Sequence, residues 1–458
     1  MSAEKNHSES QGRFLRPLGT SERFYWIYDQ LACTNFSIIA EIDGTISPES
    51  LKSAIARAIA IHPVLRIKVN AGPGHRLDFA SVAEKEAIDN IDVKAISASS
   101  VNWQLLQEID TRFQPGSFPM MRCRILHGPP KDESTIIFTF HHSMTDAIGG
   151  VFLVRKIIAY LFSPSSVQAA DAPAGCNNSS IIDAQESLFP ARYRGWRLPF
   201  TLVRGLAGRC TDALQRGWSR QLPTIGKPAA HRQLDIIRLV LDEKQTEALI
   251  QACRSEKTTL HGFLCSSLLL AVRKEFDAAG DRDGKDIVLS VISAVDMRRW
   301  LAKTIIPENA PGLFASLVPT THRVKVFVNP WDLACGVNKR LAANLGRGAA
   351  HMLWKVLPSW WITPDMNGAR RILRLISAGP KGPIVTNLGA ITPPQTVAET
   401  PVRSLSFAIG PAVYFPLCVT ADSWAGKLFV NCTFDGAVID RRLAEGIMAR
   451  IRQRLLVG

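Results

Sequence analysis

Apolar and polar positions in the first third of the chain alternate in patterns that predict strands and helices in turn. Residues 36–42 are apolar and β-branched and end at an Asp-Gly turn dipeptide, which predicts a strand. Ser47 and Pro48 then open a helix whose apolar residues recur on one face as far as His62 and Pro63. Residues 64–69 alternate like a half-buried strand. The sequence therefore predicts a strand, a helix and a second strand.

Further strands follow before a strongly apolar helical segment. Residues 121–126 alternate, a Gly-Pro-Pro turn comes next, and residues 135–140 are β-branched and aromatic, which predicts two neighbouring antiparallel strands. The apolar segment that begins near Ile148 is long enough for a helix.

A similar succession begins again in the second half. It comprises a strand at 234–241, a helix from about Thr259 to Phe276, an apolar strand at 287–295, a helix capped by Asn329, strands near 404–409, 413–419 and 428–434, and a helix from about 441 to 455. We expect these late strands to complete the second half. The predicted division is an N-terminal domain at 1–165, a linker at 166–232 and a C-terminal domain at 233–458.

Length and composition agree with two α/β domains. At 458 residues and 46% hydrophobic, the chain is too long for one simple core, and two domains of about 200 residues are expected. The polar N-terminus and the lack of a long apolar run predict a soluble, cytoplasmic protein. The nine cysteines are scattered without a C-x-x-C pair, so we expect free thiols.

The formal charge of +14 favours an acidic partner. Coenzyme A phosphates, an acidic carrier protein and anionic lipid all fit, whereas no DNA-binding motif or basic and aromatic interleaving supports nucleic acid. Seven arginines lie between Arg192 and Arg220 among apolar residues and form either a surface for lipid or carrier protein or a solvated linker.

Ionisable groups crowd together at residues 138–150, directly after the strand at 135–140. His141 and His142 stand at this strand-to-loop junction, and Asp146 follows four residues after His142. A neutral imidazole held on rigid backbone is suited to accept a proton near pH 7. A metal site is disfavoured because adjacent strand residues point to opposite faces and no further ligands stand at suitable spacing. A purely structural histidine pair remains an alternative. His141 and Asp146 also have the H-x4-D spacing of glycerol-phosphate acyltransferases, but the sequence shows none of the other motifs expected of those enzymes.

The run His141-His142-x-x-x-Asp146 resembles the HHxxxDG signature of the superfamily that includes chloramphenicol acetyltransferase, carnitine acyltransferases, polyketide-associated acyltransferases and condensation domains. The resemblance implies that His142 is the general base, that Asp146 is mainly structural and paired with an arginine, and that His141 packs behind the loop. Ala147 departs from the pattern, since glycine is usual there. A backbone with positive φ would be strained at Ala147, and Gly149 and Gly150 would supply part of the missing freedom.

Two later stretches extend the resemblance. Asp296-Met-Arg298 follows the apolar strand in the manner of the V-D-x-R pattern, which makes Arg298 the expected partner of Asp146, with Arg299 second. The stretch from Thr386 to Gly389 resembles the S-N-x-G element near the catalytic histidine, and Thr386 and Asn387 are candidate oxyanion or tunnel contacts.

The resemblance implies two similar chloramphenicol acetyltransferase-like α/β domains with mixed sheets, arranged in a V with a tunnel between them. The implied reaction moves an acyl group from acyl-CoA or an acyl-carrier phosphopantetheine thioester to a small-molecule alcohol in secondary metabolism, with no bound cofactor and no metal. A freestanding amide-forming condensation enzyme and a catalytically degenerate binding module are the alternatives.

Overall fold

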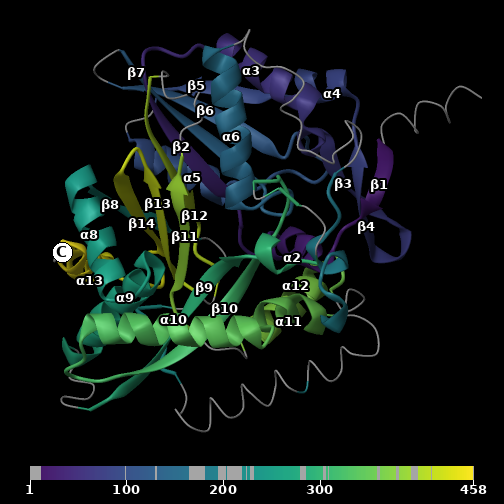
Figure 1. Cartoon of the computed structure of the whole chain (residues 1–458). Helices are drawn as coiled ribbons and strands as arrows, with labels where there is room; N and C mark the ends of the chain where they lie inside the picture. The colour runs from purple at the N-terminus through teal and green to yellow at the C-terminus, as the bar shows by residue number, and fades with distance from the viewer. Residues whose placement is uncertain are drawn as a thin grey trace, which may run out of the picture.

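The computed structural model shows a mixed α/β protein with two halves, each built around a sheet (Figure 1). The structure describes residues 12–97, 100–128, 132–163, 181–193, 203, 219–222, 224–226, 232–278, 285–302, 306–307, 309–357, 362–377, 381–392, 401–413 and 415–456. In Figure 1 the purple and blue elements of the first half fill the upper part, and the teal to yellow elements of the second half lie mostly below and to the left.

The first sheet has five strands in the order β12-β2-β7-β6-β5. Neighbours are antiparallel except for β5 and β6, which are parallel. The strands are β2 (Phe36–Asp43), β5 (Asp92–Ile96), β6 (Met121–Gly128), β7 (Glu133–Phe140) and β12 (Val402–Ile409). The predicted strands at 36–42, 121–126 and 135–140 are therefore confirmed, and their antiparallel pairing places the end of β7 between the starts of β2 and β6.

Alternate residues of β2 reach different cores, because side chains alternate across a strand. Ile38 and Ala40 belong to the main hydrophobic cluster with α3 (Pro48–Ile61) and α6 (Ala147–Phe162), whereas Ile39 packs with α5 (Val101–Asp110) on the opposite face.

The predicted helix cap is present, since Ser47 accepts the Ser50 N–H at the start of α3. The predicted strand at 64–69 is partly wrong. Residues Pro63–Arg66 form a 3-10 turn after the helix, and β3 begins only at Ile67. Pro63 stands at the first position of this turn, where its fixed φ and missing N–H are tolerated.

The second sheet has six strands in the order β10-β9-β11-β13-β14-β8. Its strands are β8 (Leu234–Leu241), β9 (Ile287–Asp296), β10 (Ala315–Val324), β11 (Ile384–Ile391), β13 (Leu417–Trp424) and β14 (Lys427–Asp435). Four helices pack with it around a second hydrophobic cluster, namely α8 (Glu243–Ser255), α9 (Leu260–Ala278), α10 (Pro330–Gly346) and α13 (Arg441–Leu455).

Strand β12 belongs to the first sheet, so its expected place in the second half is wrong. It pairs with β2 from Val402 to Ile409. Its other edge is held by side chains of the second sheet. The Phe407 N–H donates to Asp422 at 3.0 Å, and the Phe407 carbonyl accepts from Thr420 at 2.8 Å and from Asn431 at 2.9 Å. Strand β12 thus joins the two sheets, through backbone pairing with β2 and side-chain hydrogen bonds from β13 and β14.

The main hydrophobic cluster continues from the first half into the second. It is completed by α2 (Thr20–Tyr28), α11 (Ala349–Val356), α12 (Met366–Ser377) and α4 (Glu84–Asp89), beside a small sheet of β1 (Arg13–Pro17), β4 (Arg76–Ser81) and β3 (Ile67–Gly72). Phe24 of α2 packs edge-on against Trp354 of α11, with ring centroids 5.4 Å apart. Helix α2 therefore lies between the two halves.

Candidate active site

The two motif histidines lie where β7 ends, as the sequence predicts. The His141 N–H donates to the Met120 carbonyl at 3.1 Å, which continues the pairing of β7 with the chain before β6. Asp146 is the N-cap of α6, and its Oδ1 accepts the Gly149 N–H at 2.9 Å. A strand end and a capped helix start therefore fix the loop at both ends.

Ala147 is the first residue of α6. Among the described residues, the non-glycine positions with positive φ are His75, Lys257 and Ala425. Ala147 is not one of them, so the alanine is accommodated without backbone strain and the expected difficulty at this position does not arise.

His142 is buried, with 7% of its surface exposed, and three neighbours fix its ring. Its Nδ1 lies 3.2 Å from the Thr145 carbonyl oxygen. Because a carbonyl only accepts, Nδ1 carries the proton and Nε2 is left with its lone pair. Tyr25 stacks on the imidazole with ring centroids 4.2 Å apart, and Phe36 meets it edge-on at 5.4 Å.

Burial lowers the pKa of His142 to about 4, although the nearby charge of Asp146 and backbone carbonyls raise it in part. The imidazole is therefore neutral at physiological pH and has an unprotonated ring nitrogen. This is the protonation state that a general base requires.

His141 is fixed by partners other than those of His142. Its Nδ1 accepts the Ser143 N–H at 3.1 Å and the Ser143 hydroxyl at 2.7 Å. Its Nε2 consequently carries the proton and lies 4.0 Å from Asp29 Oδ2. Burial lowers the pKa of His141, with the charge of Asp29 acting against it. His141 thus holds the loop, in agreement with its expected supporting place.

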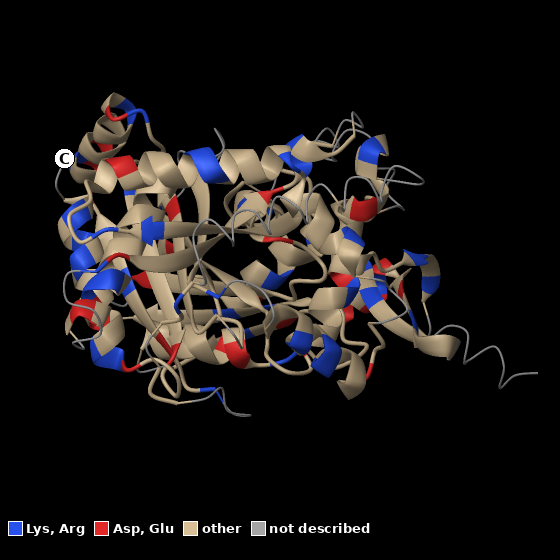
Figure 2. Cartoon of the chain, turned by 90° about the horizontal axis from the view of Figure 1, so that it is seen from below, with Lys and Arg blue, Asp and Glu red and all other residues tan. Residues whose placement is uncertain are grey.

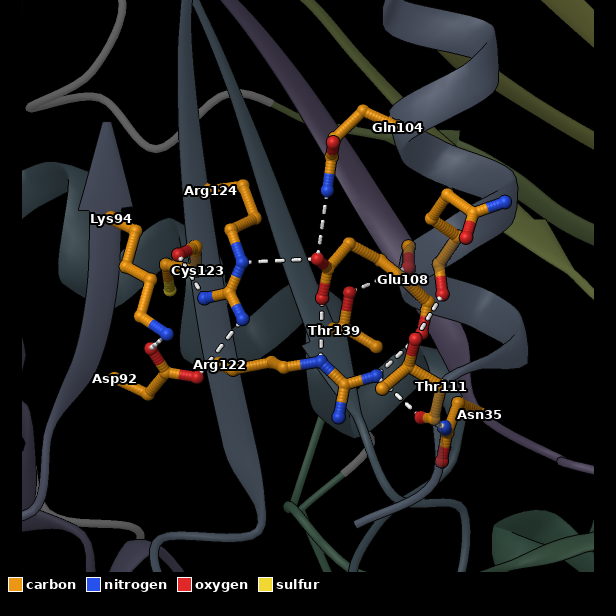
Figure 3. Close-up of polar contacts among 12 residues, drawn as sticks. Asn35, Asp92, Lys94, Gln104, Glu108, Thr111, Arg122, Cys123, Arg124 and Thr139 are labelled. Carbon is orange, nitrogen blue, oxygen red and sulfur yellow. Dashed lines mark hydrogen bonds and ion pairs between the residues drawn. The ribbon is translucent and has the colours of Figure 1, made fainter. Parts of the chain in front are cut away.

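A buried charged network lies behind His141, between β6 and α5 (Figure 3). Arg122 donates to Glu108 at 2.5 Å, and Arg124 lies 3.0 Å from the other carboxylate oxygen of Glu108. The Arg122 guanidinium stacks over the Phe113 ring at 4.3 Å, and Phe113 meets His141 edge-on at 5.9 Å. Because its charges are paired, this network gives His141 a rigid support.

The predicted Asp146–Arg298 ion pair is present and buried. Arg298 donates to both Asp146 oxygens, at 2.9 and 3.0 Å, and the Phe314 N–H donates to Asp146 at 2.9 Å. Burial alone would lower the pKa of Arg298, but the carboxylates of Asp146 and Asp296 raise it overall. Arg298 is therefore charged and joins the motif loop to the second half.

Residues 309–314 press against the motif loop on the same side. The Asp146 N–H donates to the Gly312 carbonyl at 3.1 Å, and the Gly312 N–H donates to the Thr145 hydroxyl at 3.2 Å. A Cβ at Gly149 would lie 2.9 Å from the Pro311 Cα. Glycine is needed at 149 for this close approach, which is a different reason from the backbone freedom expected from the sequence.

Thr386 and Asn387 lie on β11 where it separates from β9. Strand β11 pairs with β9 only at Ile384 and Val385, and from Thr386 onward it pairs with β13 alone. Residues 294–296 of β9 and 386–389 of β11 are partly exposed, although both strands are internal to the sheet. The sheet therefore opens at this element, which also contacts α6.

The Asn387 carboxamide has a fixed orientation. Its Oδ1 accepts the Gly389 N–H at 2.8 Å, and Gly389 has a φ of 74°. The amide N–H groups of Asn387 are thereby turned away from that turn. No hydrogen bond among the described residues joins Thr386 or Asn387 to His142.

Several contacts of the site were missed from the sequence. The run 22–28 is aromatic, but nothing in it distinguishes Tyr25 as the residue that stacks on His142. Asp29 and Phe113 likewise give no local signal. Asp29 lies more than a hundred residues before His141 in the sequence, and Phe113 lies about thirty residues before it.

The remaining expectations concern charge, membrane and metal. Most of the arginine-rich stretch, including Arg204, Arg209 and Arg216, lies outside the described residues. Figure 2 shows basic and acidic positions interspersed along the described part of the chain. Among the described helices, none combines the length and apolar character needed to cross a bilayer. Within the described ranges, no three or more His, Cys, Asp or Glu side chains are grouped so that they could hold a metal ion. The seven cysteines in these ranges are free thiols.

Comparison with known proteins gives one family match over part of the chain and several similar folds. Residues 230–410 match the family model described as phthiocerol/phthiodiolone dimycocerosyl transferase C-terminus. No curated protein matches the sequence. The fold is similar to trichothecene 15-O-acetyltransferase from Fusarium sporotrichioides, at 14% identity and a TM-score of 0.72, covering 96% of this chain and 94% of that one.

Two further solved structures have the same fold. Polyketide synthase associated protein 5 from Mycobacterium tuberculosis is 16% identical with a TM-score of 0.63, and the match covers 97% of each chain. The first condensation domain of the calcium-dependent antibiotic synthetase is 16% identical with a TM-score of 0.71, covering 96% of this chain and 95% of that one. Residues 230–410 therefore match this family model, and the chain as a whole has the fold of an acetyltransferase and of condensation domains.

Proposed function

We propose that the protein transfers an acyl group from a thioester, either acyl-CoA or an acyl-carrier protein, to the hydroxyl group of a small molecule. The observation that carries the proposal is the orientation of His142. Its Nδ1 is committed to the Thr145 carbonyl at 3.2 Å, and burial lowers its pKa to about 4. The neutral Nε2 is thus the group available to take a proton from an acceptor.

In the proposed reaction, Nε2 of His142 accepts the hydroxyl proton while the acceptor oxygen bonds to the thioester carbonyl carbon. The tetrahedral oxyanion then collapses, the carbon–sulfur bond breaks, and the thiolate takes the proton back from the imidazolium. Neither a covalent acyl-enzyme nor a metal ion is needed for this balance of atoms and charge. The negative charge of Asp146 favours the imidazolium that forms in the first step.

Asp146 has a structural part in this proposal. Four N–H groups already bind its two oxygens, from Gly149, Phe314 and twice from Arg298. A carboxylate so occupied has no remaining lone pair directed at His142, so we assign it to holding the loop rather than to proton transfer.

Thr386 or Asn387 is the proposed donor to the oxyanion. Both stand where β11 leaves β9, and the Asn387 amide N–H groups are turned away from Gly389. Pre-oriented donors of this kind are effective where charge develops in the transition state. An alcohol acceptor is favoured because a 15-O-acetyltransferase is among the similar structures, although condensation domains share the fold equally well.

The test combines product detection with a variant that keeps the local hydrogen bond. Purified protein is incubated with a panel of acyl-CoA and acyl-carrier donors and with alcohol and amine acceptors, and products are identified by mass spectrometry. In His142→Asn the amide N–H can still donate to the Thr145 carbonyl, but no base remains. We expect transfer to fall by about 10²- to 10⁴-fold. A His142→Asn enzyme with parental activity would refute the assigned role.

A further inference from the structure

Residues 181–193, here called the strap, lie within the stretch predicted as an inter-domain linker, but they are packed rather than solvated. Gln185, Glu186, Phe189 and Tyr193 are buried. The strap contacts three elements, each of which supplies part of the site around His142. A segment that only linked two domains would not be expected to make these contacts.

The first contact is at the start of α2. Gly19 precedes this helix and has no side chain to cap it. The Ser21 N–H instead donates to Glu186 Oε1 at 2.6 Å, from a residue 165 positions away. A Cβ at Gly19 would lie 2.5 Å from Glu186 Oε2. The strap therefore provides the capping group that α2 lacks.

Arg16 reinforces this contact from the neighbouring strand. Its Nε and Nη2 donate to the Ile182 carbonyl at 3.1 and 2.9 Å, while Nη1 and Nη2 donate to the Glu22 carboxylate at 2.7 and 2.8 Å. Glu22 in turn accepts the Gly19 N–H at 2.7 Å. The strap and the first turn of α2 thus share one part-buried hydrogen-bond network.

The other two contacts reach the second half. Gln185 donates to the Ala315 carbonyl at 3.2 Å, next to Phe314, whose N–H binds Asp146. The Leu188 carbonyl accepts the Ala302 N–H at 2.7 Å, just after the turn that carries Arg298. The strap therefore touches the supports of Asp146 as well as α2, whose Tyr25 stacks on His142.

We propose that Glu186 and Gln185 are positioning residues for acyl transfer, which hold Tyr25 and Phe314 at fixed places around His142 and Asp146. This inference rests on the proposed function. Glu186 acts through α2 and Gln185 through the start of β10, and neither needs to touch substrate. Burial and the neighbouring charge of Glu22 raise the pKa of Glu186. Glutamine at 186 can accept the same N–H, so it is a conservative replacement.

The experiment compares Glu186→Ala, Glu186→Gln and Ser187→Ala, the last as a control at an exposed strap position. We expect Glu186→Ala to lower kcat about tenfold with KM within about twofold of the parent, since the substrate-binding groups remain but the base loses its fixed place. Glu186→Gln and Ser187→Ala should stay within about twofold of the parent. Gly19→Ala should reproduce the loss, because it displaces the strap from the other side.

A pH profile separates positioning from general stability. Loosening α2 lets water reach His142, so the acidic limb of kcat/KM in Glu186→Ala should move from about 4 toward 6.5. A parental kcat and parental acidic limb in Glu186→Ala, while His142→Asn is inactive, would overturn the positioning role alone. If Glu186→Ala does not fold at 25 °C, Gln185→Ala takes its place, and parental kinetics in that variant would overturn the proposal equally. An active His142→Asn enzyme would instead overturn the proposed function.

Discussion

Removal of Arg298 tests the junction between the motif loop and the second half. In Arg298→Ala, Asp146 loses two of its four hydrogen bonds and keeps those from the Gly149 and Phe314 backbone. Asp146, a residue that is 4% exposed, is then left without a counter-ion. Breaking a buried ion pair in this way costs about 3 to 5 kcal/mol in the free energy of unfolding.

The reciprocal change, Asp146→Ala, has two components. It removes the N-cap of α6, which costs about 1 kcal/mol. It also leaves Arg298 without its main partner, although Asp296 at 3.0 Å and the Ala310 carbonyl at 2.7 Å still accept from it. Because the two residues share one interaction, the double variant should be less destabilised than the sum of the single variants by at least about 2 kcal/mol.

The assay is urea denaturation of the four proteins in this cycle, followed by tryptophan fluorescence, with acyl transfer measured in parallel. Arg441→Ala is the matched control, since Arg441 is exposed and pairs with Asp235 and Glu445. Its loss should cost no more than about 1 kcal/mol. If Arg298→Ala were destabilised no more than this control, the buried pair would not be the junction inferred here.

Gly149→Ala should lower both activity and the melting temperature because its Cβ would meet Pro311 at 2.9 Å, whereas Gly346→Ala, with open space around the new Cβ, should leave both unchanged. The kcat/KM of the parent enzyme should stay level from pH 8 down to about 5 and fall only near 4, since burial lowers the pKa of His142 to about 4; an acidic limb at 6.5 would contradict this. His142 and His261 both have pKa values near 4 in the folded protein, below the ordinary 6.5, so the unfolded chain binds more protons between these two pH values. The stability of the fold should therefore fall as the pH is lowered from 6.5 through 4. Melting curves at pH 7 and pH 5 would show this.

Local elements and the motif chemistry were accessible from the sequence because their signals are short-range. Ser47 and Asn329 each stand before a helix that they cap, as predicted. The Asp146–Arg298 pair is a longer-range contact, and it could be expected only because the family resemblance supplied both of its members.

The contacts that fix the site in space could not be expected from local patterns. The alternation at 404–409 reveals a strand and its two faces, but it carries no information on which strand will be its neighbour, and the strand joins β2. Glu186 lies in a stretch whose surrounding composition suggests a linker, and its partner Ser21 is 165 residues away. Such pairings depend on how complete sheets and helices pack.

The place of β12 also has a consequence for the order in which the chain can fold during synthesis. Until residues 402–409 leave the ribosome, β2 has an unpaired edge, although the rest of the first sheet is already made. An exposed strand edge is a template for pairing with other chains. A ribosome-bound fragment that ends before β12 therefore needs protection along β2, and the first half cannot be expected to form a stable, separable unit when expressed alone.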